Sequence, residues 1–417
     1  MPAPRILLAD ADAFYVSVAR LVDPEGAGKK PLLIVGGTSR ERGVVTSASY
    51  EARKFGVTSA MPMARAIRLC PDATVVPVPW EACVEKSRAI ARTLRDFTPV
   101  VEAASSDEFY VDLTGTENLY KGESLTDTAR RIRETVLKET ELNVSIGGGT
   151  NRLVAKMAAT LAKPAGVHIV EAGLEADFMR RFWLSDIPMV GPKATLRYAK
   201  HGLKSVDDAL KLSRDQLVAL LGEREGHWLY DRIRGKGPVH VEARGEAKSI
   251  SRDQTFSDDV SGMDGMEARL LRLVDRAARD LRDDGFQART VGVRVRDHDF
   301  TDRQASRTLK EPVSSERAIA RVAKQLLVKL HAARPVACRL IGVQLSNLVG
   351  DAGPAQLDLL AARPAGPDET ERDRKVSQAI DAVRKKLGAE VVQRGQGTRR
   401  RGGGTKGQGT GPSRPEA

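Results

Sequence analysis

The chain has 417 residues, a formal net charge of +12 and a sequence pI of about 9.7. It contains no run near the roughly 18 consecutive apolar residues that a membrane span needs, and its N-terminus lacks the layout of a signal peptide, so we expect a cytoplasmic protein without a membrane part. Its three cysteines have neither an even count nor metal-type spacing, which argues against a disulfide framework and a zinc finger. The basic excess favours a polyanionic partner such as nucleic acid.

The first 170 residues alternate between strand and helix patterns. Strand patterns occur at residues 6–9, 31–36, 43–47, 74–78, 100–105, 108–113, 143–147 and 166–170. Helical patterns occur at residues 14–21, 63–69, 80–96, 125–139 and 151–161, and Pro164 ends the last of them. The two strands beside residue 107 are so close in sequence that they should form a hairpin, which favours a mixed sheet and an α+β fold.

The rest of the chain divides into three stretches. Residues 177–235 are typical of short helices separated by turns, and residues 235–247 are polar enough to be a linker. Beyond the linker, strands are predicted at 248–256, 287–296, 308–313 and 336–345, with helices at 263–283 and 315–331. That order is βαββαβ, a split ferredoxin-like module. After residue 348 the pattern weakens, and residues 394–417 are predicted to be disordered, with Arg399, Arg400 and Arg401 able to touch nucleic acid nonspecifically.

Two acidic segments interrupt stretches that are otherwise typical of strands. Asp10 follows an apolar run, and Asp107 and Glu108 break a β-rich stretch. Three hard oxygen donors suit Mg²⁺ better than zinc, and two Mg²⁺ about 3.5 to 4 Å apart form the usual clamp for in-line attack on a phosphate. From the residues alone, the alternative that these acids cap turns stays open.

Six segments resemble, in family order over about residues 5–350, the Y-family translesion DNA polymerases of the DinB type. They are residues 10–15 (DADAFY), 47–57 (SASYEARKFGV), 106–108 (SDE), 145–147 (SIG), 161–166 (LAKPAG) and 187–191 (IPMVG). The resemblance implies a template-directed DNA polymerase of low fidelity that extends primers past damaged bases. It also implies a multidomain right-hand α+β architecture, whose parts are a palm at 1–12 and 78–168, small fingers at 13–77, a helical thumb at 169–236, a linker at 237–247, a little finger at 248–348 and a tail at 349–417.

The resemblance also implies a role for each acidic residue. Asp10 and Asp107 would bridge two Mg²⁺, Glu108 would complete the site that activates the primer 3′ hydroxyl, and the backbone carbonyl of Ala11 would add a ligand. The attacking hydroxyl needs this because it is a poor nucleophile until a cation stabilises its alkoxide.

The dNTP contacts implied by the resemblance come from three segments. Ser47, Tyr50, Arg53 and Lys163 would hold the triphosphate, Ala11 and Phe14 would also contact the dNTP, and Tyr15 would be a steric gate against the 2′ hydroxyl. Without the family, the residues favour a solvated helix face for Arg53 and a helix-end charge for Lys163, and a core aromatic is the alternative for Tyr15.

Partners are implied as well. The turn at 187–193 leaves backbone N–H groups free at a helix start, where Val190, Gly191 and Lys193 would meet the DNA backbone. Residues Gln356, Leu357, Leu359 and Leu360 resemble a sliding-clamp peptide. We therefore expect primer-template DNA, dNTPs and a clamp as partners of a monomeric enzyme.

Two alternative functions are considered, and several residues depart from the common pattern of the family. A catalytically silent adaptor between the clamp and other polymerases would have lost metal carboxylates, and a nucleotidyl cyclase would have no use for the basic C-terminal module. Met189 stands where the family usually has Gly. Ser106, Phe109 and the segment at 148–152 also differ from the common pattern.

Overall fold

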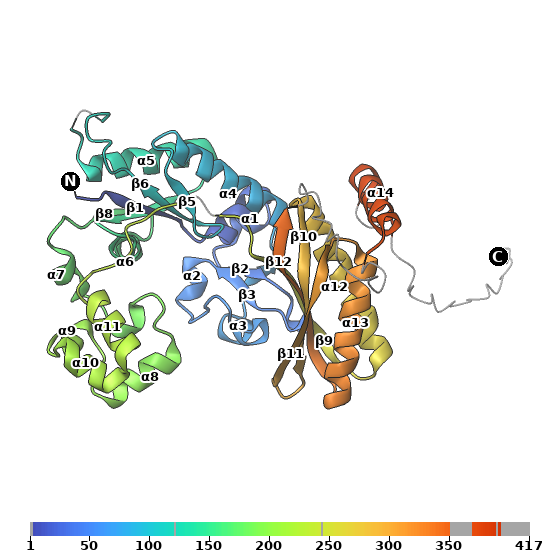
Figure 1. Cartoon of the computed structure of the whole chain (residues 1–417). Coiled ribbons are helices and arrows are strands. Elements are labelled where there is room, and N and C mark those ends of the chain that lie inside the picture. Colours follow the sequence, from blue (N-terminus) through green and yellow to red (C-terminus); the bar gives the residue numbers. More distant parts are fainter. Residues whose placement is uncertain (1–2, 121, 243–244, 351–368, 389–390, 393–417) are drawn as a thin grey trace, which may run out of the picture. The chain divides into compact units, whose positions relative to one another are not determined.

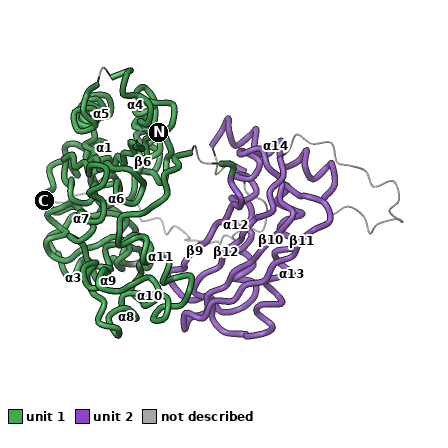
Figure 2. The backbone as a smooth tube through the Cα atoms, turned by 60° about the vertical axis from the view of Figure 1, so that its left-hand side comes forward, with its two compact units in different colours: residues 1–246 green, residues 247–417 purple. Residues whose placement is uncertain are grey.

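The computed structural model describes residues 3–120, 122–242, 245–350, 369–388 and 391–392. The chain forms two compact units, residues 1–246 and 247–417 (Figure 2). Figure 1 gives the element labels used below. Among the described residues, no helix is both long and apolar enough to cross a bilayer. Cys70, Cys83 and Cys338 are all free thiols in buried positions.

The first unit is built around a five-stranded mixed sheet in the order β5-β6-β1-β7-β8. Its strands are β1 (Ile6–Ala11), β5 (Val101–Ala103), β6 (Glu108–Asp112), β7 (Val144–Gly149) and β8 (Val167–Ile169). The pairs β5–β6, β6–β1 and β1–β7 are antiparallel, and only β7–β8 is parallel. The predicted hairpin and mixed sheet are therefore confirmed.

The central strand β1 is buried on both faces, as its continuous apolar sequence requires. Leu7, Ala9 and Ala11 pack into a core shared with α1 (Phe14–Val22), α4 (Trp80–Arg95) and α5 (Leu125–Thr140). The alternate residues Ile6 and Leu8 pack instead against Ala155 and Ala159 of α6 (Arg152–Ala162).

Helix α6 lies unusually close to the sheet because β7 consists largely of glycine where the two meet. A Cβ atom on Gly147 would lie only 2.0 Å from the backbone nitrogen of Ala159. Asn151 caps the helix, since its side chain accepts a hydrogen bond from the backbone N–H of Val154. Gly147, together with the Asn151 cap in the segment at 148–152, thus brings the face of α6 tightly over β1, which matters for the site below.

A small second sheet, in the order β3-β2-β4, lies in the predicted fingers. Its strands are β2 (Leu33–Gly36), β3 (Val45–Ala48) and β4 (Thr74–Val76), with α2 (Tyr50–Arg53) and α3 (Met63–Leu69) beside them. Ser49 caps α2 by accepting a hydrogen bond from the N–H of Ala52.

The predicted run of short helices after β8 is confirmed. It consists of α7 (Glu175–Met179), α8 (Pro192–Lys200), α9 (Val206–Leu210), α10 (Arg214–Leu221) and α11 (Glu223–Arg232), which share one hydrophobic core.

The first half of the predicted linker is not free. The backbone carbonyl of Pro238 accepts a hydrogen bond of 2.9 Å from the N–H of Arg152, and Val241 is buried against β1 and α6. Arg152 also pairs with Glu102 at 2.7 Å and donates to the carbonyl of His240. Polar composition alone predicts a linker, whereas in the structure hydrogen bonds to Arg152 and the burial of Val241 hold this stretch against the sheet and α6.

The second unit has the predicted βαββαβ order. Its elements are β9 (Ser249–Val260), α12 (Met263–Asp283), β10 (Phe286–Asp297), β11 (Asp302–Val313), α13 (Glu316–Ala333) and β12 (Cys338–Gly350). The sheet, in the order β11-β10-β12-β9, is fully antiparallel, and α12 and α13 cover one face of it (Figure 1). Strand β11 starts six residues earlier than predicted, because its first half is an edge segment whose polar side chains hid the strand pattern.

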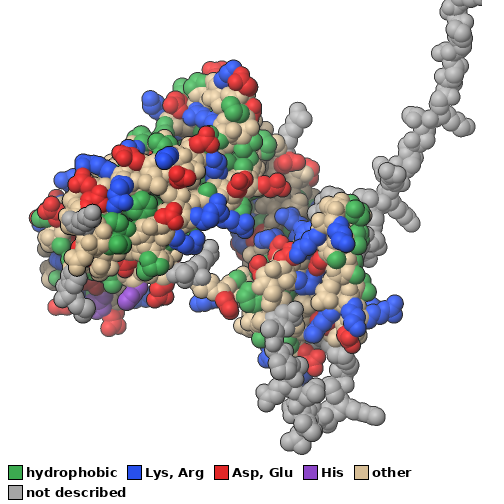
Figure 3. Space-filling model, turned by 90° about the horizontal axis from the view of Figure 1, so that it is seen from above, with side chains coloured by type: hydrophobic (Ala, Val, Ile, Leu, Met, Phe, Trp, Pro, Cys, Tyr) green, Lys and Arg blue, Asp and Glu red, His purple; other side chains and the backbone are tan. Residues whose placement is uncertain are grey.

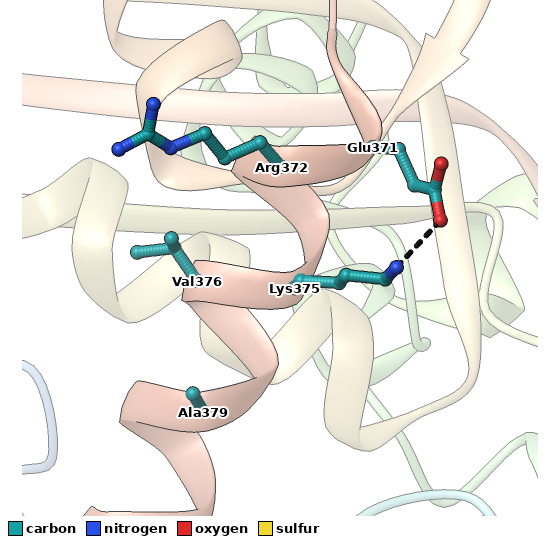
Figure 4. A pocket seen from close by; sticks show the side chains of 5 residues that line it. All are labelled: Glu371, Arg372, Lys375, Val376 and Ala379. Carbon is teal, nitrogen blue, oxygen red and sulfur yellow. Dashed lines mark ion pairs between the residues drawn. The ribbon is translucent and has the colours of Figure 1, made fainter.

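One helix, α14 (Glu371–Leu387), was not predicted within the tail. Its buried side is polar: Arg282 of α12 bonds Asp381 at 2.7 Å, and Ser377 donates to Glu316 of α13. Its other side exposes Val376, Ala379, Val383 and Leu387. Figure 4 shows the side chains that line a pocket at its first turns, with the ion pair between Glu371 and Lys375. The tail therefore contains a helix that belongs to the second unit, and its inverted polarity kept the usual amphipathic pattern from revealing it.

Candidate active site

The two distant acidic segments meet at one edge of the five-stranded sheet. Asp10 near the end of β1 and Glu108 at the start of β6 are direct cross-strand partners. The backbone N–H of Ala11 donates to the carbonyl of Asp107 at 2.9 Å. Asp10 and Glu108 therefore share the face that α6 covers, and Asp107 lies in the adjoining turn.

Two lysines of the α6 segment face these carboxylates. The Nζ atom of Lys163, just after the helix, lies 2.7 Å from Oδ2 of Asp10, and the Nζ atom of Lys156 lies 2.6 Å from both oxygens of Glu108. Lys163 was predicted from the sequence, but Lys156 was missed. The available signal was their spacing of seven residues, which puts both lysines on one side of a helix.

Burial perturbs the carboxyl group of Asp10. Burial, which leaves it 8% exposed, raises its pKa to about 6; Lys163 opposes that change, while Glu108 and Asp107 add to it. Asp107 is held by the Ser105 hydroxyl, which donates to its Oδ1 at 2.6 Å.

The acidic edge of the sheet has suitable metal ligands, but they are not gathered around one point. Nowhere in the part of the chain that the structure describes do three His, Cys, Asp or Glu side chains converge as ligands around one point. Asp10 and Glu108 turn to their lysines instead, so shared cations would have to replace these ion pairs. The chemistry of the donors still fits, because closely spaced carboxylates are the groups that hard divalent cations such as Mg²⁺ select.

Asp12, two residues after Asp10, is a buried polar centre that the site prediction missed. Its carboxylate accepts hydrogen bonds from the hydroxyls of Tyr50 and Ser145 and from the backbone N–H of Ala165. The signal was its place in the DADAFY segment, but nothing local distinguished it from a capping residue.

The predicted triphosphate residues of the fingers lie on β3 and α2. Tyr50 stacks with Arg53, whose guanidinium carbon lies 5.0 Å from the ring centre, and the Nε of Arg53 donates to the carbonyl of Ala48 at 2.9 Å. Ser47 lies in β3 and is buried. Burial and the nearby Asp12 both raise the pKa of the Tyr50 phenol, so this group stays protonated at neutral pH.

The two aromatic residues that begin α1 have different environments. Phe14 is buried in the core at 1% exposure, so a nucleotide could meet only its backbone. Tyr15 is half-buried, and its hydroxyl shares a hydrogen bond of 2.9 Å with that of Ser106 in the turn that carries Asp107. Trp80 meets the Tyr15 ring edge to face with 6.0 Å between ring centres.

The predicted phosphate turn lies at the start of α8. Gly191 is the N-cap residue, Lys193 is exposed in the first turn, and Val190 is buried beneath it. Met189 adopts a φ of 76°, in the region that favours glycine, and its side chain is 88% exposed. The departure from the family's glycine is thus accommodated with backbone strain.

The second unit offers an open sheet face opposite α12 and α13. Val293 and Val295 of β10 point into the core, so the alternating Arg294 and Arg296 point to the open face. Both bond Asp302 of β11, at 2.9 and 2.8 Å, and these hydrogen bonds hold the pKa of Asp302 well below its usual range. Figure 3, a view of the whole molecule, shows Lys and Arg interleaved with Asp and Glu on the surface in view.

Comparison with known proteins agrees with this geometry. The impB/mucB/samB family model matches residues 9–160, and the model of that family's C-terminal domain matches residues 247–359. The DNA polymerase IV of Desulfatibacillum aliphaticivorans is 37% identical over 389 residues, which are 93% of this chain and 95% of that protein. The DNA polymerase IV of Caulobacter vibrioides is 35% identical, with 93% and 92% covered.

Solved structures show the same architecture. A chimeric Y-family DNA polymerase built from Dbh and Dpo4 matches with a TM-score of 0.74 and 25% identity over 83% of this chain and 99% of that one. DinB from Sulfolobus solfataricus, 24% identical with a TM-score of 0.54 over the same shares of the two chains, supports the fold.

An acidic edge on a mixed sheet, followed by short helices and a βαββαβ unit, is the α+β architecture of a multidomain DNA polymerase. The chain belongs to the impB/mucB/samB family and is a Y-family polymerase of the DinB type. It is a DNA-directed DNA polymerase that uses primer-template DNA and dNTPs, its family depends on divalent metal, and translesion synthesis is the family's general role. This assignment as a DNA polymerase excludes the two alternatives, a nucleotidyl cyclase and a catalytically silent adaptor. The predicted clamp peptide, Gln356, Leu357, Leu359 and Leu360, lies outside the described residues.

Proposed function

We propose that this polymerase extends primers past damaged template bases, with low fidelity, by nucleotidyl transfer that uses two Mg²⁺. The cross-strand pair of Asp10 and Glu108, with Asp107 in the adjoining turn, is the observation that carries this proposal. It puts three carboxylates from two sequence segments at one edge of the sheet, which is the donor set that two-metal phosphoryl transfer requires.

In this proposal Asp10 and Asp107 are shared ligands, Glu108 completes the site beside the primer terminus, and the carbonyl of Ala11 contributes a further oxygen. Bound Mg²⁺ would stabilise the 3′ alkoxide and neutralise the triphosphate charge. In the absence of bound metal, Lys163 forms an ion pair with Asp10, and Lys156 forms one with Glu108. These ion pairs offset the repulsion between two carboxylates that lie side by side.

The incoming nucleotide would displace part of this arrangement. Lys163, released from Asp10, would offer its ammonium group to the triphosphate, while Arg53 would offer planar donors that match phosphate oxygens. Tyr50 and Ser47 would add hydroxyl groups. Tyr15 would lie under the sugar, and the backbone of Ala11 and Phe14 would line the same side.

Primer-template DNA would meet both units. In the turn at Val190, Gly191 and Lys193, the N–H of Val190 is already bonded to the carbonyl of Ile187, so phosphates would meet the start of α8 at Gly191 and the exposed ammonium group of Lys193. The open sheet face with Arg294 and Arg296 suits the backbone of a duplex. We also propose that the enzyme is a cytoplasmic monomer and that the peptide beginning at Gln356 docks on a sliding clamp.

Primer extension tests the core of the proposal. Asp107→Ala should abolish extension in Mg²⁺, whereas Asp112→Ala, at the other end of β6, should leave it nearly intact. An Asp107→Ala enzyme that still extends primers at near wild-type rate would refute the assignment. Extension across a panel of damaged templates, with and without a sliding clamp, then tests lesion bypass and clamp docking.

A further inference from the structure

Asp12 joins three segments that lie far apart in the sequence. The Tyr50 hydroxyl donates to its Oδ1 at 3.0 Å, and the Ser145 hydroxyl lies 2.9 and 3.0 Å from its two oxygens. The backbone N–H of Ala165 donates to Oδ2 at 2.8 Å. One carboxylate thus contacts α2 of the fingers, strand β7 and the loop after α6.

The Asp12 carboxylate is held in place by several hydrogen bonds, unlike the neighbouring carboxylate of Asp10, which is a proposed metal ligand. Asp12 is only 6% exposed, and burying a carboxylate is tolerated only when hydrogen bonds replace its hydration. Here the two oxygens are shared among two hydroxyl donors and a backbone N–H. Asp10, by contrast, faces the ammonium group of Lys163.

The segments that Asp12 joins carry two of the proposed triphosphate groups. Tyr50 is fixed between Asp12 and the guanidinium of Arg53. Ala165 lies two residues after Lys163, so the hydrogen bond to Ala165 restrains the loop that holds Lys163. One side chain, that of Asp12, therefore sets the spacing between Tyr50 in the fingers and Lys163 in the palm.

We propose that Asp12 is a positioning residue for the incoming nucleotide: its carboxylate holds Tyr50 and the Lys163 loop at the spacing that one triphosphate spans. The inference rests on the proposed dNTP roles of Tyr50 and Lys163 and adds a residue that touches neither substrate nor metal. Its loss should therefore weaken dNTP binding more than it slows the step after binding.

Asp12→Asn is the sharpest variant because it keeps the shape and replaces one acceptor oxygen by an amide donor. The hydroxyls of Tyr50 and Ser145 can rotate to accept from that amide, but the N–H of Ala165 cannot reverse. The charge-assisted hydrogen bonds are weakened without a cavity, and we expect KM for a correct dNTP to rise about tenfold with kcat changed less than about threefold.

Single-nucleotide insertion kinetics measure both constants, with primer-template affinity and the melting temperature recorded alongside. Asp112→Asn is the matched control, since Asp112 also accepts a backbone N–H, from Thr114 at 2.8 Å, but at the far end of β6. It should leave KM within about twofold of the wild-type value. A purely structural role for Asp12 would lower the melting temperature and leave KM unchanged.

A double-mutant cycle between Asp12 and Tyr50 is the second test of the inference. Tyr50→Phe removes one donor, and the rise in KM that it causes should be smaller in the Asp12→Asn background than in the wild type. Ser145→Ala perturbs Asp12 without altering it and should raise KM about threefold, which keeps the test available if Asp12 variants do not fold. Full additivity of Asp12→Asn and Tyr50→Phe would overturn the inference.

The failure of this inference differs from failure of the proposed function. If Asp107→Ala still extends primers, the proposed catalytic site is wrong whatever Asp12 does. If Asp107→Ala is inactive and Asp12→Asn keeps a KM within twofold of wild type, only the positioning role of Asp12 is refuted.

Discussion

The ionised carboxylate of Asp10 should destabilise the folded protein at neutral pH, so replacing it should increase the free energy of unfolding. Burial raises its pKa from 3.8 to about 6 in the folded protein. At about 1.4 kcal/mol for each pKa unit, ionised Asp10 costs the folded state about 3 kcal/mol, and this value already includes the attraction to Lys163. Asp10→Asn removes the ionisation and should therefore stabilise the first unit while abolishing primer extension.

The sign of the pH dependence follows from proton binding. Between pH 4 and 6 the folded state keeps a proton on Asp10 that the unfolded state has lost, so the stability of the wild type falls relative to Asp10→Asn as the pH rises. Linkage gives an advantage for the variant of about 1.5 kcal/mol at pH 5 and about 3 kcal/mol at pH 8. Mg²⁺ should stabilise the wild type more than the variant and so narrow this difference.

Calorimetry from pH 5 to pH 8 is the appropriate assay, because it can separate the transitions of a two-unit chain. Asp107→Asn is the control: it removes the same charge and the same activity, but from a half-buried turn, so it should gain little stability. A gain for Asp10→Asn that does not grow with pH, or an equal gain for Asp107→Asn, would refute the argument from burial.

Three further outcomes are expected. Tyr15→Ala should admit ribonucleotides, with discrimination by kcat/KM falling at least about tenfold and dNTP use falling modestly; unchanged sugar discrimination would count against the steric gate. Asp302→Asn should free its two arginine partners on the open sheet face, tighten duplex binding and steepen the slope of log affinity against log salt by about one; an identical slope would contradict that surface's role. Arg282→Ala should remove the ion pairs that Arg282 makes with Asp381 and Glu316 and cost about 3 to 5 kcal/mol, with increased hydrogen exchange in α14; unchanged protection of α14 would show that these ion pairs do not hold it.

The strand alternation and the placement of the acids could be predicted from the sequence because both are local signals. An apolar run that ends at Asp10, and a β-rich stretch broken at Asp107, predict strands with carboxylates at their ends. The short distance between two strand patterns predicts the hairpin. The βαββαβ order was readable for the same reason, since each element shows its own period along the chain.

Other features needed the tertiary structure. Helix α14 escaped prediction because it buries polar residues such as Ser377 and exposes apolar ones such as Val376, which reverses the usual pattern. The stretch around Pro238 has the polar composition of a linker, but its carbonyl accepts a hydrogen bond from Arg152, a partner far away in sequence that composition cannot reveal.

Residue type and local spacing fix which carboxylates, lysines and aromatic rings are available for chemistry, so these candidates are evident from the amino-acid order. Which of them come into contact depends on the packing of distant segments. Lys156 faces Glu108 because β6 and α6 pack on each other, and Asp12 joins Tyr50, Ser145 and Ala165 because three distant segments fold around it. Such contacts depend on side-chain directions in three dimensions, which no period along one chain specifies.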